Sequence, residues 1–161
     1  MRHDIEMTVN GEKLSIEVVP RDVLLDVLRS RLGIKSPKIG CERGDCGACT
    51  VLIDGKTIRS CLVLAVEADG HEVTTVEGIE HAGLTAVQET MIEQSAFQCG
   101  FCAPGIVVVA AELVGRNPHP TAGDVREAIA GNLCRCTGYE SIVEAVVAAT
   151  TVTRSRAGGE A

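Results

Sequence analysis

Residues 40–51 read Gly-Cys-Glu-Arg-Gly-Asp-Cys-Gly-Ala-Cys-Thr-Val and contain three of the eight cysteines in this chain of 161 residues. Four residues separate Cys41 from Cys46, and two separate Cys46 from Cys49. The glycines between them permit backbone conformations that are closed to residues with a Cβ, so amide N–H groups can turn toward the sulfurs. Clustered thiolates bind metals such as iron and zinc. The stretch therefore predicts a metal-binding loop.

A fourth cysteine joins this loop through a predicted β-hairpin. Residues 54–55 are Asp-Gly, a dipeptide favoured in two-residue turns, and β-type sequences flank them on both sides. A two-residue turn pairs Ile53 with Lys56, and continuing the pairing outward brings Cys61 beside Cys49. The spacing of the first three cysteines is that of a plant-type ferredoxin loop, which binds a 2Fe–2S cluster. We therefore expect this cluster to be held by Cys41, Cys46, Cys49 and Cys61.

The remaining four cysteines lie in the second half of the chain and form a Cys-x-x-Cys and a Cys-x-Cys pair: Cys99, Cys102, Cys134 and Cys136. Each pair stands between two segments with helical patterns. Two interhelical turns that meet at one end of a bundle can present four thiolates to one centre, and the helix N-termini that follow each pair favour the thiolate form. Taken alone, this group fits structural zinc as well as an iron–sulfur cluster.

The composition limits the classes of function. The net charge is −7 at pH 7 and only 2% of residues are aromatic, which argues against nucleic acid and anionic membranes as partners. The longest apolar run, residues 106–111, is much shorter than the roughly 18 residues that a membrane span needs. The first residues lead into no signal-peptide pattern, so we expect a cytoplasmic protein. In a reducing compartment, cysteines serve as metal ligands or redox groups more often than as disulfides.

The first half of the sequence is typical of a small mixed sheet with one helix. Strands are expected in five segments: residues 5–9, 14–18, 50–53, 56–59 and 72–76. The expected helix begins after a candidate N-cap at Asp22, carries leucines at helical spacing and stops at Gly33.

The second half is expected to be helical. Apolar residues recur at helical spacing in four segments: residues 84–91, 104–113, 121–129 and 142–149. Asp124 follows three residues after Thr121, which is a capping-box pattern for the third of them. The character of the sequence changes around residues 77–83, where we expect a domain boundary. The protein is therefore expected to be α+β, with a ferredoxin-type domain at 1–78, a helical cluster-binding domain at 79–153 and a flexible tail at 154–161.

Four motifs occur in order along the chain: residues 40–51, Ser60-Cys-Leu62, Gln98-Cys-Gly-Phe-Cys-Ala-Pro-Gly105 and Gly131-Asn-Leu-Cys-Arg-Cys-Thr-Gly-Tyr139. With these motifs the chain resembles the small iron–sulfur subunit of molybdenum hydroxylases, the family of xanthine dehydrogenase, aldehyde oxidoreductase and aerobic carbon monoxide dehydrogenase. The resemblance extends from about Ile5 to Ala149. The departures are Ala103, where threonine is common, and Glu42-Arg43, where Gly-Glu is more usual; neither changes a cysteine.

The resemblance implies a β-grasp, plant-ferredoxin-like domain followed by a four-helix domain, each with one 2Fe–2S cluster. It implies that the cluster nearer to molybdenum is held by Cys99, Cys102, Cys134 and Cys136, and the cluster nearer to flavin by Cys41, Cys46, Cys49 and Cys61. It also implies that Gln98 and Cys136 approach the molybdopterin of a large subunit. From there, electrons are expected to pass through both clusters to FAD of a medium subunit or another acceptor, in a heterotrimer or its dimer.

The expected function is therefore that of the electron-transfer subunit of an oxidoreductase. The sequence shows no Ser/His/Asp constellation, phosphate loop or paired acid site, so no substrate turnover is expected from this chain alone. Two alternatives stay open: a stand-alone two-cluster electron carrier and a zinc-stabilised interaction module. The single tyrosine, Tyr139, is predicted to be a packing residue with a hydrogen-bonded hydroxyl rather than a redox relay.

Overall fold

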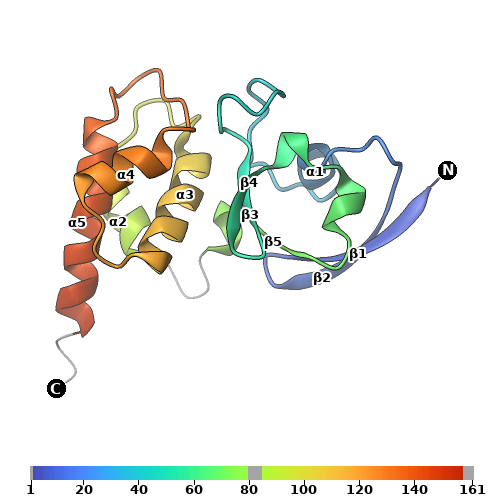
Figure 1. Ribbon diagram of the computed structural model, residues 1–161, viewed down its shortest axis with the longest axis horizontal. Helices are drawn as coiled ribbons and strands as arrows, with labels where there is room; N and C mark the ends of the chain where they lie inside the picture. Colours follow the sequence, from blue (N-terminus) through green and yellow to red (C-terminus); the bar gives the residue numbers. More distant parts are fainter. Residues whose placement is uncertain (1, 80–84, 158–161) are drawn as a thin grey trace.

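The chain folds into a sheet half and a helical half that lie side by side along the long axis of the molecule (Figure 1). The computed structural model describes residues 2–79 and 85–157, with the side chains described as far as residue 150. The sheet half is built on five strands: β1 (His3–Val9), β2 (Glu12–Val18), β3 (Thr50–Ile53), β4 (Lys56–Arg59) and β5 (Glu72–Thr74). Their order is β2-β1-β5-β3-β4, and β1 pairs antiparallel with β2 but parallel with β5. The predicted mixed sheet is confirmed.

The β3–β4 hairpin sets the position of the cysteines that flank it. Asp54 and Gly55 have φ values of 50° and 77°, the left-handed conformation that a two-residue turn of this kind requires at both central positions. Ile53 pairs with Lys56 as predicted, and Thr50 pairs with Arg59 at the far end of the ladder. The last strand, β5, is shorter than the predicted segment 72–76 and ends at Thr74.

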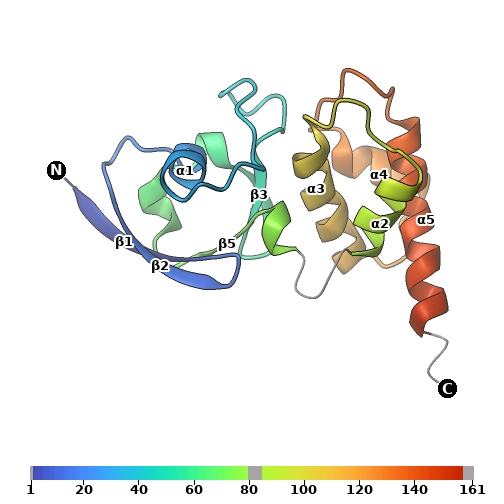
Figure 2. The same cartoon turned by 180° about the vertical axis from the view of Figure 1, so that it is seen from behind.

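The predicted helix of the sheet half is present and lies over one face of the sheet (Figure 2). It begins as α1 (Leu24–Asp26), widens into the turn η1 (Val27–Arg31), and is followed by Gly33 with φ of 73°. Its leucines join a core of fully buried side chains: Val18, Leu24, Leu28, Val51 and Val73. Short 3-10 turns complete this half: η2 (Ser60–Leu62), η3 (Ala65–Ala68) and η4 (Val76–Gly78).

The prediction of Asp22 as the N-cap is wrong. Val23 stands at that position, and no side chain caps the helix. The Asp22 carboxylate instead accepts a hydrogen bond of 2.9 Å from the Val19 N–H and pairs with Arg31. Asp22 therefore closes the preceding turn, which competes with capping for the same oxygen atoms.

The helical half contains the four predicted helices: α2 (Ala86–Glu93), α3 (Ala103–Arg116), α4 (Ala122–Ile129) and α5 (Glu140–Ala157). The capping box at Thr121 is confirmed, since the Thr121 N–H donates to Asp124 Oδ2 over 2.7 Å and the Asp124 N–H donates to Thr121 Oγ1 over 3.2 Å. α5 continues through the first residues of the segment 154–161 that the sequence assigns to a tail, while 158–161 lie outside the described residues. Residues 80–84, which include the predicted start of the first helix, also lie outside them.

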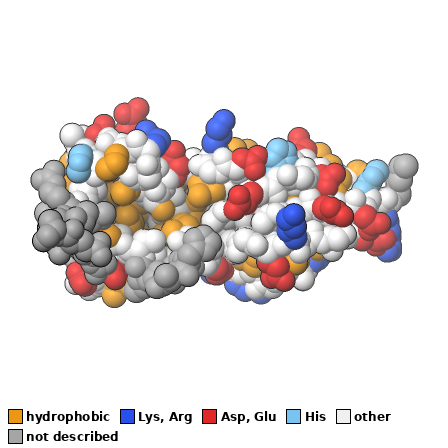
Figure 3. Space-filling model, turned by 90° about the horizontal axis from the view of Figure 1, so that it is seen from below, with side chains coloured by type: hydrophobic (Ala, Val, Ile, Leu, Met, Phe, Trp, Pro, Cys, Tyr) orange, Lys and Arg blue, Asp and Glu red, His pale blue; other side chains and the backbone are white. Residues whose placement is uncertain are grey.

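The surfaces of the two halves differ. Seen from below, a patch of hydrophobic side chains lies on the helical half, whereas acidic and basic side chains are scattered over the sheet half (Figure 3). Among the described residues, no helix has the length and apolar character needed to cross a bilayer.

Candidate metal centres

The sheet half gathers one group of four cysteines, the sheet group: Cys41, Cys46, Cys49 and Cys61. The first three lie in the loop before β3, and Cys61 lies in η2, directly after β4. The β3–β4 ladder continues past its last pair, because the Ser60 N–H and Oγ donate to the Cys49 carbonyl oxygen over 3.3 Å and 2.7 Å. The hairpin therefore brings the last two cysteines together as predicted, and only 2% of Cys49 and 8% of Cys61 are exposed.

The loop turns backbone N–H groups toward sulfur. The N–H groups of Arg43 and Cys46 both donate to Cys41 Sγ over 3.4 Å. These hydrogen bonds favour the thiolate and lower the pKa of Cys41 to about 7. Gly44 permits the turn with φ of 84°, and a Cβ there would lie 2.5 Å from Leu62 Cδ1. The expected role of the loop glycines is confirmed at this position.

Burial acts in the opposite direction on Cys61. It raises the pKa of the Cys61 thiol to about 11, and the neighbouring Cys49 thiol adds to the effect. The sheet group thus combines a thiol that ionises readily with one that stays protonated until a cation displaces its proton.

The helical half gathers the other four cysteines, the helical group: Cys99, Cys102, Cys134 and Cys136. Cys99 and Cys102 lie between α2 and α3, and the other pair lies between α4 and α5, so both turns are at the same end of the bundle (Figure 1). The Cys136 thiol donates to Cys99 Sγ over 3.5 Å. The two interhelical turns therefore meet, as the sequence predicts.

The thiols of the helical group also differ in pKa. Burial raises the pKa of Cys102 to about 12, whereas the Phe101 backbone N–H lowers the pKa of Cys99. Burial also acts to raise the pKa of Cys134, but the Thr137 hydroxyl, whose oxygen is 3.2 Å from Cys134 Sγ, and nearby backbone N–H groups outweigh it and the pKa is lowered.

Gln98 and Tyr139 each hydrogen-bond to the backbone of the turn that carries the last cysteine pair. Gln98 is on the surface, and its Nε2 donates to the Cys136 carbonyl oxygen over 3.0 Å. The Tyr139 hydroxyl accepts from the Cys134 N–H over 2.8 Å and donates to the Asn132 carbonyl oxygen over 3.3 Å. The prediction that Tyr139 packs with a hydrogen-bonded hydroxyl is confirmed.

Direct hydrogen bonds join the two cysteine groups. The Leu133 N–H donates to the Cys46 carbonyl oxygen over 2.9 Å. Beside it, Asn132, which is 1% exposed, donates from Nδ2 to the Gly47 carbonyl oxygen over 2.9 Å and to Thr50 Oγ1 over 3.2 Å. Neither Leu133 nor Asn132 was predicted to be functional, because no local pattern distinguishes them within their motif.

The donor chemistry and the packing around the sulfurs fit a 2Fe–2S cluster in each group. A cluster of this kind takes four thiolates, two for each iron. In the part of the chain that is described, no set of three or more Cys, His, Asp or Glu side chains closes around a point for a single metal ion. Instead, thiols meet in pairs, such as Cys99 with Cys136 and Cys49 with Cys61. A Cβ on Gly40 would lie 2.8 Å from Cys46 Sγ, so the glycine leaves room beside that sulfur.

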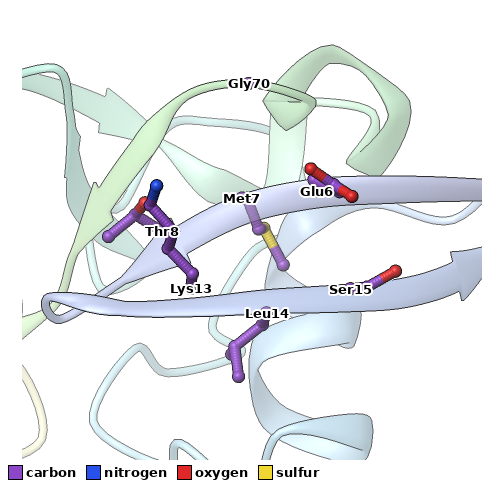
Figure 4. Close-up of a pocket in the computed structure, with 7 residues that line it drawn as sticks. All are labelled: Glu6, Met7, Thr8, Lys13, Leu14, Ser15 and Gly70. Carbon is purple, nitrogen blue, oxygen red and sulfur yellow. The ribbon is translucent and has the colours of Figure 1, made fainter.

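A separate hollow lies along β1 and β2, away from the cysteines. Figure 4 shows Glu6, Lys13 and Ser15 among the side chains that line it, and no cysteine belongs to its lining. It shares no residue with either cysteine group.

Comparison with known families gives two matches that together span most of the chain. Residues 7–78 match the family described as "2Fe-2S iron-sulfur cluster binding domain", and residues 75–147 match "[2Fe-2S] binding domain". The nicotine 6-hydroxylase small subunit of Paenarthrobacter nicotinovorans is 47% identical over 91% of this chain and 88% of that protein. The xanthine dehydrogenase iron-sulfur-binding subunit of Escherichia coli is 44% identical over 89% of this chain and 91% of that protein.

Solved structures agree with these matches. The chain resembles one in quinoline 2-oxidoreductase from Pseudomonas putida 86 with a TM-score of 0.90 and 44% identity, covering 99% of both chains. It also resembles the aldehyde oxidoreductase of Desulfovibrio desulfuricans with a TM-score of 0.91 and 43% identity, covering 95% of this chain but 17% of that longer one.

Proposed function

Because the chain belongs to the family of small 2Fe–2S subunits of molybdenum hydroxylases and dehydrogenases, we propose that it relays electrons between a molybdopterin-containing large subunit and a flavin-containing medium subunit. A 2Fe–2S cluster accepts and releases a single electron, so two of them supply the chemistry of a relay. The observation that carries the proposal is the Leu133–Cys46 hydrogen bond, which joins a cysteine of the sheet group to the residue before Cys134.

The eight cysteines are the proposed ligands, four for each cluster. The sheet group (Cys41, Cys46, Cys49 and Cys61) supplies one set, and the helical group (Cys99, Cys102, Cys134 and Cys136) supplies the other. Backbone N–H groups aimed at Cys41 support this assignment, because such hydrogen bonds stabilise the negative charge of ligating sulfur. The paired approach of Cys99 and Cys136 supports it in the helical half.

The two groups are proposed to face different partners. Cys99 and Cys136 are exposed, and Gln98 is fixed to the Cys136 carbonyl oxygen, so this end of the helical half is suited to meet the molybdopterin of the large subunit. Phe101 and Leu133, which are 49% and 58% exposed, lie beside these cysteines in sequence and offer apolar surface for the same contact. The sheet group is then proposed to pass electrons to FAD or another acceptor.

Between the groups, the chain itself provides a short route. From the Cys46 carbonyl oxygen, one hydrogen bond leads to the Leu133 N–H, and the next residue is Cys134. This route needs no side chain to move. A heterotrimer, or a dimer of heterotrimers, in the cytoplasm is the assembly proposed for this arrangement.

The test is to isolate the native complex and analyse its metals and cofactors. We expect about four iron and four acid-labile sulfide ions for each copy of this chain, as two 2Fe–2S clusters require, together with molybdenum and flavin on associated chains. Zinc without sulfide would instead support an interaction module. Clusters in a chain that never associates with molybdenum or flavin would support a stand-alone carrier.

A further inference from the structure

Arg59 connects the two halves of the molecule at the cysteine groups. It is the last residue of β4, and its Nη1 donates to Thr50 Oγ1 over 2.7 Å within the sheet half. Its Nη2 reaches the helical half, where it donates to the Gly131 carbonyl oxygen over 2.7 Å and to Asn132 Oδ1 over 3.3 Å. One guanidinium thus joins Thr50, the residue after Cys49, to the turn that precedes Cys134.

The partners of Arg59 hold it in a fixed place. Thr50 and Asn132 are 2% and 1% exposed, and they also hydrogen-bond to each other. A Cβ on Gly131 would lie 2.5 Å from Arg59 Nη2, so a glycine is needed for the guanidinium to approach this carbonyl. The planar fork of arginine matches several acceptors at once, which the ammonium of lysine cannot do in the same geometry.

The charge of Arg59 has no acidic partner in the described part of the chain. The ion pairs found there involve other cations, and the atoms that Arg59 contacts are neutral oxygens. Arginine stays protonated in proteins, so a full positive charge is present where the two halves meet. Arg59 is two residues from Cys61, and its contact Asn132 is two residues from Cys134.

We propose that Arg59 is a positioning residue shared by both cluster sites, which fixes their loops relative to each other and favours the reduced state of both clusters. The inference rests on the proposed function, because it requires a cluster in each group. Reduction adds one negative charge to a cluster, and a nearby cation in a partly buried setting stabilises that charge. A single residue thereby raises two midpoint potentials together.

The experiment compares three variants of the intact complex by redox titration followed by electron paramagnetic resonance, which resolves the two reduced clusters. Arg59→Gln removes the charge and is expected to shift both midpoint potentials downward. Arg59→Lys keeps the charge and is expected to restore most of that shift. Arg116→Gln is the matched control, because this substitution removes the same charge far from the cysteines. Arg116 is the last residue of α3, about 20 Å along the helix from Cys102, and it pairs with Glu112.

Each outcome has a defined meaning. A shift of both clusters in Arg59→Gln, with recovery in Arg59→Lys and none in Arg116→Gln, supports the proposal. The proposal is overturned if Arg59→Gln shifts the midpoint potential of neither cluster or of only one. Equal shifts in the Gln and Lys variants also overturn it, because the effect would then not depend on the charge of Arg59. Iron and sulfide content of the unmodified complex separates these failures from failure of the proposed function. If Arg59→Gln does not assemble, Arg59→Met takes its place, because it also removes the charge: lowered midpoint potentials of both clusters support the proposal, and unchanged ones overturn it.

Discussion

The two cysteine groups each bring four thiols together, but they differ in how far those thiols are exposed to solvent. In the sheet group, Cys49 and Cys61 flank the β3–β4 hairpin and are buried together with Leu25. In the helical group, Cys99 and Cys136 are exposed, and Cys102 is buried against the bundle core. The difference fits the proposal that the helical group meets the large subunit, whereas the sheet group has two cysteines buried and two half-buried within its own half.

The groups also differ in how far apart their cysteines lie in the sequence. Three cysteines of the sheet group come from a single loop of nine residues, 41–49, whose backbone N–H groups serve one sulfur. The helical group instead needs two turns separated by α3 and α4 to meet. We expect the helical site to depend more strongly on tertiary packing, since its ligands are distant in sequence.

The largest effect is expected from replacing one cysteine of either group, which should remove one cluster and leave the other. Cys61→Ser is expected to remove the sheet cluster and Cys134→Ser the helical one, because each takes a thiolate from a set of four. Iron content should fall by roughly half in each, and electron paramagnetic resonance should retain the signal of the other cluster. The two variants are controls for each other. Loss of both signals in either variant would show that the sites are not independent.

The next effect concerns the thiols after chelation of the metal. Cys41, with a pKa of about 7, is expected to react with iodoacetamide at pH 7 far faster than Cys61 or Cys102, with pKa values of about 11 and 12. The thiolate is the reactive form. As the pH rises, the rate at Cys41 should level off above its pKa while the rates at the other two keep increasing. Mass spectrometry of the labelled peptides measures this, and equal rates at pH 7 would contradict it.

A smaller effect is expected where the halves touch. Gly105→Ala places a Cβ 2.5 Å from the Gly47 carbonyl oxygen, so the contact between the halves must shift, and we expect a loss of about 1–3 kcal/mol in the free energy of unfolding. Gly115→Ala in the same helix meets nothing within 4 Å and should be neutral or stabilising by up to about 1 kcal/mol. Urea denaturation of the holoprotein compares the two. An equal response would mean that the contact is not tight.

The smallest effect is expected at Arg43. Its guanidinium is exposed and pairs with Asp45 over 3.5 Å, so solvent screens its charge. Arg43→Glu should lower the midpoint potential of the sheet cluster by a few tens of millivolts, about the size of a weak surface interaction, and leave the helical cluster unchanged. A redox titration that shows no shift, or a rise, would count against this charge effect.

Much of the fold could be predicted because its signals are local. The Asp-Gly turn at residues 54–55 fixed the register that places Cys61 beside Cys49, and the pattern at Thr121 located the capping box of α4. Asp22 shows the limit of such signals, since one carboxylate can cap a helix or close a turn, and the surrounding structure decides between them.

The contacts between the halves could not be predicted. Arg59 and Asn132 are separated by 73 residues, and Asn132 and Gly47 by 85. No periodicity or spacing relates residues so far apart, because their approach depends on how the sheet docks against α3. The sequence therefore indicated the two cysteine sets but gave no sign of the polar side chains that hold them together.

The buried Asn132 contact has a further consequence. Two separate proteins could not associate stably through a handful of polar hydrogen bonds and close glycine contacts, because association would cost several kcal/mol of translational and rotational entropy. Here only residues 80–84 join Ile79 to Thr85, so the halves meet at a high effective concentration, on the order of millimolar or more. Covalent tethering thus allows a contact that rests partly on buried polar side chains to set the separation of the two cysteine groups, whereas independent carriers would have to offset that entropy through their interface alone.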